Sequence, residues 1–214
     1  MKVLRAFFAR EKGFFLSGGG ALAGFYLGHR PTDDLDFFTA DRLAFERGRY
    51  VLSDVARAIG AQIDVRQDTP AFQRFVLSAE EGGLVVDLVC DQTFQLRPNK
   101  PELDGIRVDP PEEILANKLT ALVGRAEERD LVDVLFLERA GWRVEEALTA
   151  ALQKDGGCTP ATLAWILSEM EVADSVKLPG GVSPAEMRIF INDLIRRLRL
   201  AALPGVKSAD PRAQ

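Results

Sequence analysis

The sequence has too few cysteines and histidines to build a disulfide framework or a transition-metal site. It contains two cysteines, Cys90 and Cys158, and one histidine, His29. A disulfide scaffold needs several cysteines, and a zinc-type site needs Cys and His ligands at short, regular spacings. We therefore expect both cysteines to be free thiols and His29 to have a structural role.

Long apolar runs and an excess of positive charge are also lacking. No segment approaches the length of a membrane span, and charged residues interrupt the apolar N-terminal segment at positions 5, 10, 11 and 12, unlike a signal peptide. The net charge of -5 argues against nucleic-acid binding driven by bulk charge, although a local basic patch can suffice. The remaining composition, 47% hydrophobic and 28% charged over 214 residues, is that of a globular protein with one large or two small domains. We expect a cytoplasmic location and no membrane partner.

A glycine run is the first informative feature that is present. Ser17, Gly18, Gly19 and Gly20 lack large side chains, so their backbone N–H groups can approach an anion closely. A helix that begins at Gly20 or Ala21 also directs its positive end toward that anion. The run therefore indicates a place to hold phosphate.

An acidic triplet follows the glycine run at the start of an apolar strand. Strand alternation sends Asp34 and Asp36 to one face, and Leu35 and Phe37 to the other. Two carboxylates about 6–7 Å apart along a strand can share a hard cation through their oxygen atoms. Together with the glycine run, the triplet predicts a site for a nucleoside triphosphate (NTP) and a divalent metal.

The chain has an α/β first half and a helical second half. The patterns predict strands at 14–16, 35–39, 61–66, 72–78 and 84–90, with the last two forming a hairpin, and helices at 21–27 and 43–59. They then predict helices at 110–123, 126–140, 144–154, 159–170 and 183–203. We expect domains at 1–105 and 106–203, and a disordered tail at 204–214.

Two motifs in this order resemble a known family. Gly18-Gly19 followed by Asp34-Leu35-Asp36 is similar to the glycine–aspartate signature of the polymerase-beta nucleotidyltransferase superfamily. With PPEEILANKLTALVGRAEERDLVDVLFL at 110–137, the chain resembles the AbiEii/AbiGii abortive-infection toxins. The resemblance implies an α+β fold: an N-terminal polymerase-beta-like nucleotidyltransferase domain, with a mixed sheet and flanking helices, followed by a C-terminal helical bundle.

The same resemblance implies an activity. Members transfer a nucleoside monophosphate from an NTP to an acceptor, with Mg²⁺ or Mn²⁺ and release of pyrophosphate. They are toxins of bacterial toxin–antitoxin pairs, and some extend the 3′ end of transfer RNA. We expect an NTP substrate, a transfer RNA or other RNA acceptor, and a cognate antitoxin.

Superfamily sites typically add a third carboxylate from a neighbouring strand. Asp87 is the stronger candidate because it lies in the apolar run LVVDLV, where an unpartnered charge is expensive to bury and so requires a cation or hydrogen bonds. Asp64 is the competing candidate, but its polar surroundings also suit a solvated residue. Asp34 and Asp36 are then metal ligands, and Asp87 is a ligand or the general base for the incoming hydroxyl.

The downstream motif supplies two further candidates. Lys118 lies beside an apolar stripe, so it either extends along it to solvent or, as the resemblance implies, binds the triphosphate. The resemblance also implies that Asp130 helps to set the active site. Asp133 matches the same motif, and an ordinary surface pair with Arg129 is the alternative for it.

Two positions near the glycine run remain open. Arg30 either clamps a phosphate or pairs with Asp33 or Asp34 to hold the loop. Gly20 stands where many family members carry Ser or Thr, so the hydroxyl that touches phosphate in those proteins must come from Ser17 or be replaced by backbone groups.

The acceptor is the least determined part of this prediction. Arginines that could contact RNA phosphates lie at positions 125, 129, 139 and 143 or at 196, 197 and 199, yet the latter also suit the solvent face of an amphipathic helix. Two alternatives stay open: a nucleotidyltransferase for small molecules, and a catalytically silent module that binds a nucleotide or a partner.

Overall fold

The computed structural model describes residues 2–79 and 82–203, so the expected tail at 204–214 lies outside the described residues. The chain forms two compact units, Met1–Ile114 and Leu115–Gln214. The division falls within a helix, after the boundary expected near residue 105, because residues 101–109 belong to the first unit. There Leu16 bridges Val108, and the Asp109 N–H donates to the Leu16 carbonyl at 2.8 Å.

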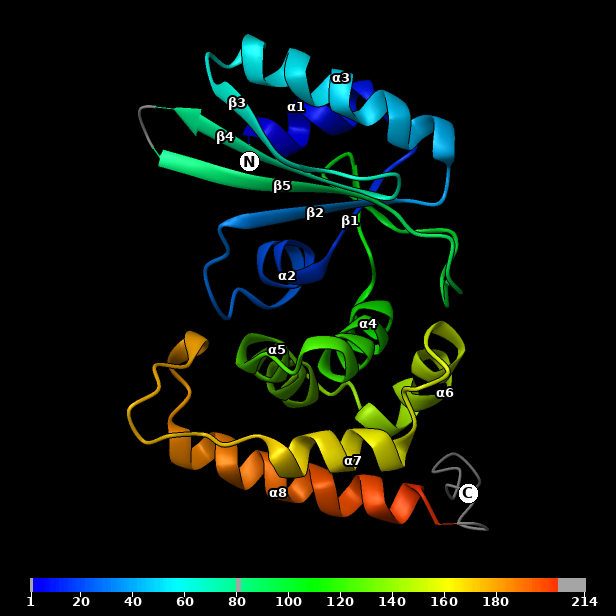
Figure 1. Cartoon of the computed structure of the whole chain (residues 1–214), viewed down its shortest axis with the longest axis vertical. Helices are drawn as coiled ribbons and strands as arrows, with labels where there is room; N and C mark the ends of the chain where they lie inside the picture. Colours follow the sequence, from blue (N-terminus) through cyan, green and yellow to red (C-terminus); the bar gives the residue numbers. More distant parts are fainter. Residues whose placement is uncertain (1, 80–81, 204–214) are drawn as a thin grey trace. The chain divides into compact units, whose positions relative to one another are not determined.

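A five-stranded mixed sheet forms the centre of the first unit (Figure 1). Its strands are β1 (Phe15–Ser17), β2 (Asp34–Thr39), β3 (Gln62–Asp68), β4 (Phe72–Ala79) and β5 (Gly82–Cys90), in the order β1-β2-β5-β4-β3. β2 and β5 are parallel, and the other pairs are antiparallel. The strand-to-strand order therefore places the acidic strand β2 next to β5, which carries Asp87.

Helices cover both faces of this sheet in Figure 1. These helices are α1 (Lys2–Arg10), α3 (Arg42–Ala58), and α2 (Gly18–Ala21) continued by the π-helical turn η1 (Leu22–Leu27). A cluster of phenylalanine rings joins α1 to the sheet: Phe7 lies 5.4 Å from Phe14 and 4.7 Å from Phe37 between ring centroids. The apolar side of β2 is thereby buried, and its acidic side faces away from this core.

The second unit is helical, as expected. Its helices are α4 (Pro111–Arg125, which starts in the first unit), α5 (Glu128–Arg139), α6 (Val144–Lys154), α7 (Pro160–Glu169) and α8 (Pro184–Ala201), with a 3-10 turn η2 at Pro179–Gly181. The Thr159 and Ser183 hydroxyls accept from the N–H groups of Thr162 and Glu186, which fixes the starts of α7 and α8. None of the helices in the described ranges is long and apolar enough to cross a membrane.

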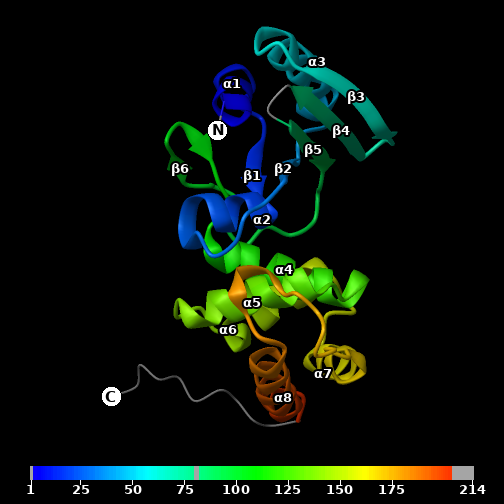
Figure 2. The same cartoon turned by 90° about the vertical axis from the view of Figure 1, so that its left-hand side faces the viewer.

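The α+β fold class is confirmed, but helix α1 and a short hairpin were among the elements not predicted. α1 was overlooked because charged residues interrupt its apolar sequence, although Val3, Leu4, Phe7 and Phe8 fall on one helical face and are all buried. The short hairpin of β6 (Glu102–Leu103) and β7 (Ile106–Arg107) was also missed, and Figure 2 shows it beside β1. Gly124, expected to end a helix, instead lies within α4.

Candidate active site

Strand register aligns the candidate residues in a row across one face of the sheet. Ser17 of β1 is the partner of Asp36 in β2, and Asp36 is the partner of Asp87 in β5. Asp87 is in turn opposite Arg74 of β4. Since neighbouring strands lie about 4.8 Å apart, Asp36 and Asp87 are adjacent, and Asp34 follows on the same face of β2. The third carboxylate chosen from sequence is therefore next to the first two.

The glycine run is packed directly on this row. Gly18 has a φ of +63°, and a Cβ placed on it would overlap the Asp36 carboxylate. A Cβ on Gly19 would lie 2.5 Å from a guanidinium nitrogen of Arg30. Glycine is therefore required at Gly18 by its backbone conformation, whereas a Cβ at Gly19 would displace the flexible end of Arg30.

Ser17 is buried, and its hydroxyl donates a hydrogen bond of 2.5 Å to Asp109. Asp109 also pairs with the Lys100 ammonium at 2.7 Å, and Lys100 pairs with Glu113 at 3.2 Å. Burial raises the pKa of Asp109, although Lys100 and Ser17 act in the opposite direction. The Ser17 hydroxyl is thus held in a buried ionic network that fixes the start of the glycine run.

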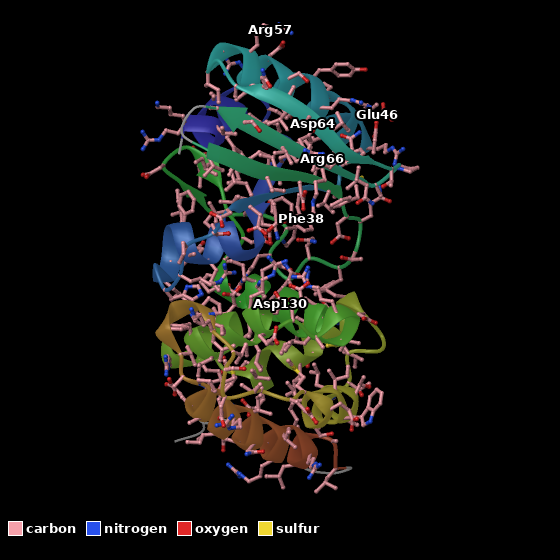
Figure 3. All side chains as sticks on the ribbon, turned by 60° about the vertical axis from the view of Figure 1, so that its left-hand side comes forward. Phe38, Glu46, Arg57, Asp64, Arg66 and Asp130 are labelled. Carbon is pink, nitrogen blue, oxygen red and sulfur yellow. The ribbon has the colours of Figure 1, made fainter. Side chains whose placement is uncertain are left out.

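Asp87 has the cationic partner that its apolar surroundings require. Arg74 donates from Nε to one Asp87 oxygen at 2.8 Å and from Nη2 to the other at 2.6 Å. The Asp87 side chain is 5% exposed and that of Arg74 is 47% exposed. Arg74 was missed, but the predicted hairpin contained the signal, because Arg74 is the one charged residue of FQRFVLS and falls on the Asp87 face. Asp64 is instead exposed on β3 and pairs with Arg66, as expected of a solvated residue (Figure 3).

Asp34 and Arg30 belong to the segment that joins the glycine run to β2. The Thr32 hydroxyl donates to Asp34 at 2.6 Å and so orients this carboxylate. Arg30 donates to the Pro31 carbonyl at 3.2 Å while it covers Gly19. The segment thus places a guanidinium over the glycine run and a carboxylate at the start of β2.

Lys118 and Asp130 are brought together in the helical unit. The Lys118 ammonium lies 2.7 Å from Asp130 and 2.6 Å from Asp133, and both carboxylates are fully buried. Arg125 adds two hydrogen bonds to Asp130, at 2.8 and 3.0 Å. Burial alone would raise the pKa of Asp130, but the Arg125 hydrogen bonds and the Lys118 charge outweigh it, so this pKa is lowered. Lys118 is 6% exposed, so the interpretation as a lysine that extends to solvent is wrong. Figure 3 marks Asp130 within this unit.

The comparison with known proteins identifies the family of the chain. The model of the family described as nucleotidyl transferase AbiEii toxin, type IV TA system, matches residues 2–204. The chain belongs to the AbiEii family. It is therefore a nucleotidyltransferase of the toxin type, as the two sequence motifs predicted. No curated protein matches the chain.

Solved structures share the fold of this AbiEii-family chain at low sequence identity. A candidate nucleotidyltransferase from Helicobacter pylori has a TM-score of 0.58 at 18% identity, with 94% of this chain and 96% of that chain covered. JHP933, also from Helicobacter pylori, has a TM-score of 0.57 at 21% identity, with 94% and 92% covered. MenT4, a nucleotidyltransferase toxin from Mycobacterium tuberculosis, has a TM-score of 0.55 at 16% identity, with 95% and 82% covered. The three likenesses establish the fold across both units.

Three carboxylates of the candidate site suit a hard cation in type and register. Asp34, Asp36 and Asp87 offer oxygen ligands from adjacent positions on one sheet face, which is the donor set that Mg²⁺ and Mn²⁺ prefer. Within residues 2–79 and 82–203, however, no three acidic, histidine or cysteine side chains converge closely enough to hold an ion. Asp87 faces Arg74 and Asp34 faces Thr32. Strands β2 and β5 thus bring three carboxylates to one face of the sheet, while hydrogen bonds turn the Asp34 carboxylate toward Thr32 and the Asp87 carboxylate toward Arg74.

Most of the arginines considered for RNA contact are engaged in ion pairs. Arg197 is 12% exposed and pairs with Glu138, Glu145 and Asp193, so its pKa is raised: burial alone would lower it, but these carboxylates outweigh burial. Four others pair at the surface: Arg129 with Glu127, Arg139 with Glu186, Arg143 with Glu145 and Arg196 with Asp193. The Arg197 interactions hold helices together, which is a structural role that the amphipathic pattern did not reveal.

Proposed function

We propose that this AbiEii-family chain transfers a nucleoside monophosphate from an NTP to the 3′ end of a transfer RNA. In this proposal it acts in the cytoplasm as the toxin of a toxin–antitoxin pair, with a cognate antitoxin as its partner. The observation that carries the proposal is the register of Asp36 and Asp87, which occupy partner positions on one face of the sheet beneath the glycine run.

Asp34, Asp36 and Asp87 are the proposed ligands of Mg²⁺ or Mn²⁺. A divalent ion at such carboxylates neutralises triphosphate charge and orients the phosphoryl group that is transferred. The residues of the chain fix where this happens: Thr32 orients Asp34, and Gly18 allows Asp36 to pack against the backbone of the glycine run. Asp87 is either a third ligand or the group that accepts the proton of the attacking hydroxyl.

The proposed triphosphate contacts are the backbone of the glycine run and two cationic side chains, Arg30 and Lys118. Gly18, Gly19 and Gly20 offer backbone N–H groups, and Arg30 brings a guanidinium over Gly19. The Ser17 hydroxyl is directed at Asp109, so we assign the phosphate contact at this position to the backbone. Lys118 has three N–H groups, of which two serve Asp130 and Asp133, and we propose that the third binds a phosphate oxygen.

The test is a transfer assay with matched aspartate variants. Wild type, Asp36→Asn and Asp64→Asn are incubated with each of the four α-labelled NTPs, Mg²⁺, and either total bacterial RNA or purified transfer RNA. We expect label on transfer RNA with wild type and Asp64→Asn, and its loss with Asp36→Asn. Asp64→Asn is the control because Asp64 is an exposed aspartate of the same sheet, paired with Arg66.

Other outcomes separate the parts of the proposal. Full transfer by Asp36→Asn contradicts the metal assignment. NTP binding without labelled RNA contradicts the RNA acceptor and favours a small-molecule acceptor. Pyrophosphate release measured with candidate small molecules then distinguishes such an enzyme from a silent binding module.

A further inference from the structure

Arg74 lies beside the three carboxylates of Asp34, Asp36 and Asp87, and the proposed reaction gives it no role. It lies on β4 opposite Asp87, and its fork donates to both Asp87 oxygens. A bidentate guanidinium–carboxylate pair is among the stronger side-chain hydrogen-bonded pairs. Arg74 therefore holds the orientation of the Asp87 carboxylate.

The pair is unequal in burial. The Asp87 side chain is 5% exposed, so water cannot replace Arg74 as the partner of its carboxylate. The Arg74 side chain is 47% exposed, and its guanidinium borders solvent. The guanidinium carbon also lies 5.5 Å from the centroid of the Phe72 ring, a cation–π contact that does not depend on Asp87. The Arg74 guanidinium can thus leave Asp87 and be solvated by water, while the buried Asp87 carboxylate requires a cation beside it whether or not Arg74 is that cation.

Arg74 and a metal ion would be attracted by the same carboxylates. Arg74 is the register partner of Asp87, and Asp87 is the register partner of Asp36 on the same face of the sheet. A cation held by Asp36 and Asp87 would therefore experience the attraction that Arg74 experiences. Meanwhile the described side chains do not converge into a three-ligand site, and Asp87 is turned toward Arg74.

We infer that Arg74 is a resident counter-ion of the carboxylate row that competes with the metal for Asp87, and so sets the metal affinity of the site. This inference depends on the metal site of the proposed function. Arg74 acts on the metal through Asp87, which makes it a positioning residue. Were Asp87 to hold a metal ion, the Arg74 guanidinium would turn toward the solvent that it already borders.

The inference predicts a gain of metal affinity when the competitor is removed. Arg74→Gln should bind Mn²⁺ at least about tenfold more tightly than wild type, the change expected when one charged hydrogen-bonded competitor is lost. Its metal-free form should melt at a lower temperature, because Asp87 is left buried without its cation. A larger rise in Tm on addition of Mn²⁺ should accompany both effects.

The experiment measures Mn²⁺ binding without nucleotide. The full-length proteins are freed of metal with EDTA, and unbound Mn²⁺ is followed by electron paramagnetic resonance during titration, with Tm recorded in parallel. The set is wild type, Arg74→Gln, Arg74→Lys, Asp36→Asn and Arg66→Gln. Arg66 is the control because it is an arginine on the neighbouring strand β3 that pairs with exposed Asp64. Arg74→Lys keeps the charge without the fork, and its affinity should lie between those of wild type and Arg74→Gln.

A second readout follows the wild-type protein and does not require Arg74→Gln. The Nε–H signal of Arg74, assigned by its absence in Arg74→Lys, should shift in nitrogen-15 NMR spectra when Mg²⁺ is added, because its bond to Asp87 breaks. This readout holds even where Arg74→Gln does not fold.

Three results would overturn the inference. Unchanged or weaker Mn²⁺ binding by Arg74→Gln, with wild-type binding that depends on Asp36, refutes the competition and leaves the metal site intact. An Arg74 signal that does not move at saturating Mg²⁺ has the same meaning. Wild type that binds no Mn²⁺, or binds it equally well as Asp36→Asn, refutes the metal site and the inference together.

Discussion

Replacement of Lys118 by methionine should destabilise the helical unit strongly. The Lys118 ammonium lies between Asp130 and Asp133, both fully buried, at 2.7 and 2.6 Å. Removal of one partner from a buried ion pair typically costs about 3–5 kcal/mol, because a charge is left without compensation. Asp130 keeps Arg125 in the variant, so we expect the lower end of this range, about 3 kcal/mol.

Urea unfolding measures this change. Trp142 and Trp165 both lie in the unit Leu115–Gln214, so tryptophan fluorescence reports this unit. Lys118→Met should lower the transition midpoint without changing its slope. The double variant Lys118→Met/Asp133→Asn should regain part of the loss, because the charge left behind is removed as well.

The pH dependence gives an independent check. The pKa of Asp130 is lower in the folded protein than in the unfolded chain, since Arg125 and Lys118 outweigh the effect of burial. The stabilisation from ionised Asp130 is therefore fully present above its unfolded pKa of about 3.9, and is lost as the pH falls through the folded pKa. The stability difference between wild type and Asp130→Asn should accordingly shrink below about pH 4.

An unfolding free energy of Lys118→Met within about 0.5 kcal/mol of wild type would refute this reasoning, since changes of that size are typical of surface substitutions. The result also decides how activity data are interpreted. If Lys118→Met is both inactive and destabilised, loss of transfer alone does not demonstrate a triphosphate contact. NTP binding by the folded fraction is then the measurement that does.

Two further predictions concern backbone and thiol positions. Gly18→Ala should abolish transfer and lower the free energy of unfolding by at least about 1 kcal/mol, because Gly18 has a φ of +63° and a Cβ there would displace Asp36. Gly24→Ala is the matched control, since a Cβ at Gly24 meets nothing within 4 Å, and equal transfer by the two variants would contradict the role of the glycine run. Burial raises the pKa of Cys158 to about 12, so at pH 8 a thiol reagent should modify half-buried Cys90 in the native protein and reach Cys158 only after denaturation. Rapid modification of both thiols without denaturant would contradict the burial of Cys158.

Local sequence signals predicted most of the elements because each depends on neighbouring residues. Thr159 and Ser183 mark helix starts through hydrogen bonds that reach only three residues ahead, and Gly60, with a φ of +72°, ends a helix by its own conformation. The hairpin β6–β7 was not predicted, because strands of two residues are too short to show the alternation of apolar and polar residues. Its place is decided by contacts with β1, which is distant in the sequence.

The parts of the candidate site that depend on strand alternation and on local composition could be predicted from the sequence. Alternation along β2 correctly separates Asp34 and Asp36 from Leu35 and Phe37, because the backbone geometry of a strand requires it. The adjacency of Asp36 and Asp87 depends on the parallel pairing of β2 with β5, and no local pattern encodes this pairing. Asp87 was nevertheless selected, since an isolated acid in an apolar strand must find a partner wherever the strand lies.

Charge patterns were the weakest guide, and Arg197 shows the reason. It was grouped with Arg196 and Arg199 as a possible RNA contact, yet it is buried against Glu138 and Glu145 while Arg196 pairs at the surface with Asp193. The difference arises because Arg197 meets acidic residues of the α5–α6 region, which are more than 50 positions away in the sequence. An arginine count therefore overstates the charge available to an RNA phosphate, since a paired arginine must first exchange its carboxylate. The same reasoning applies to Arg74 and Asp87, where the identity of the counter-ion, more than the number of charges, determines what the site can bind.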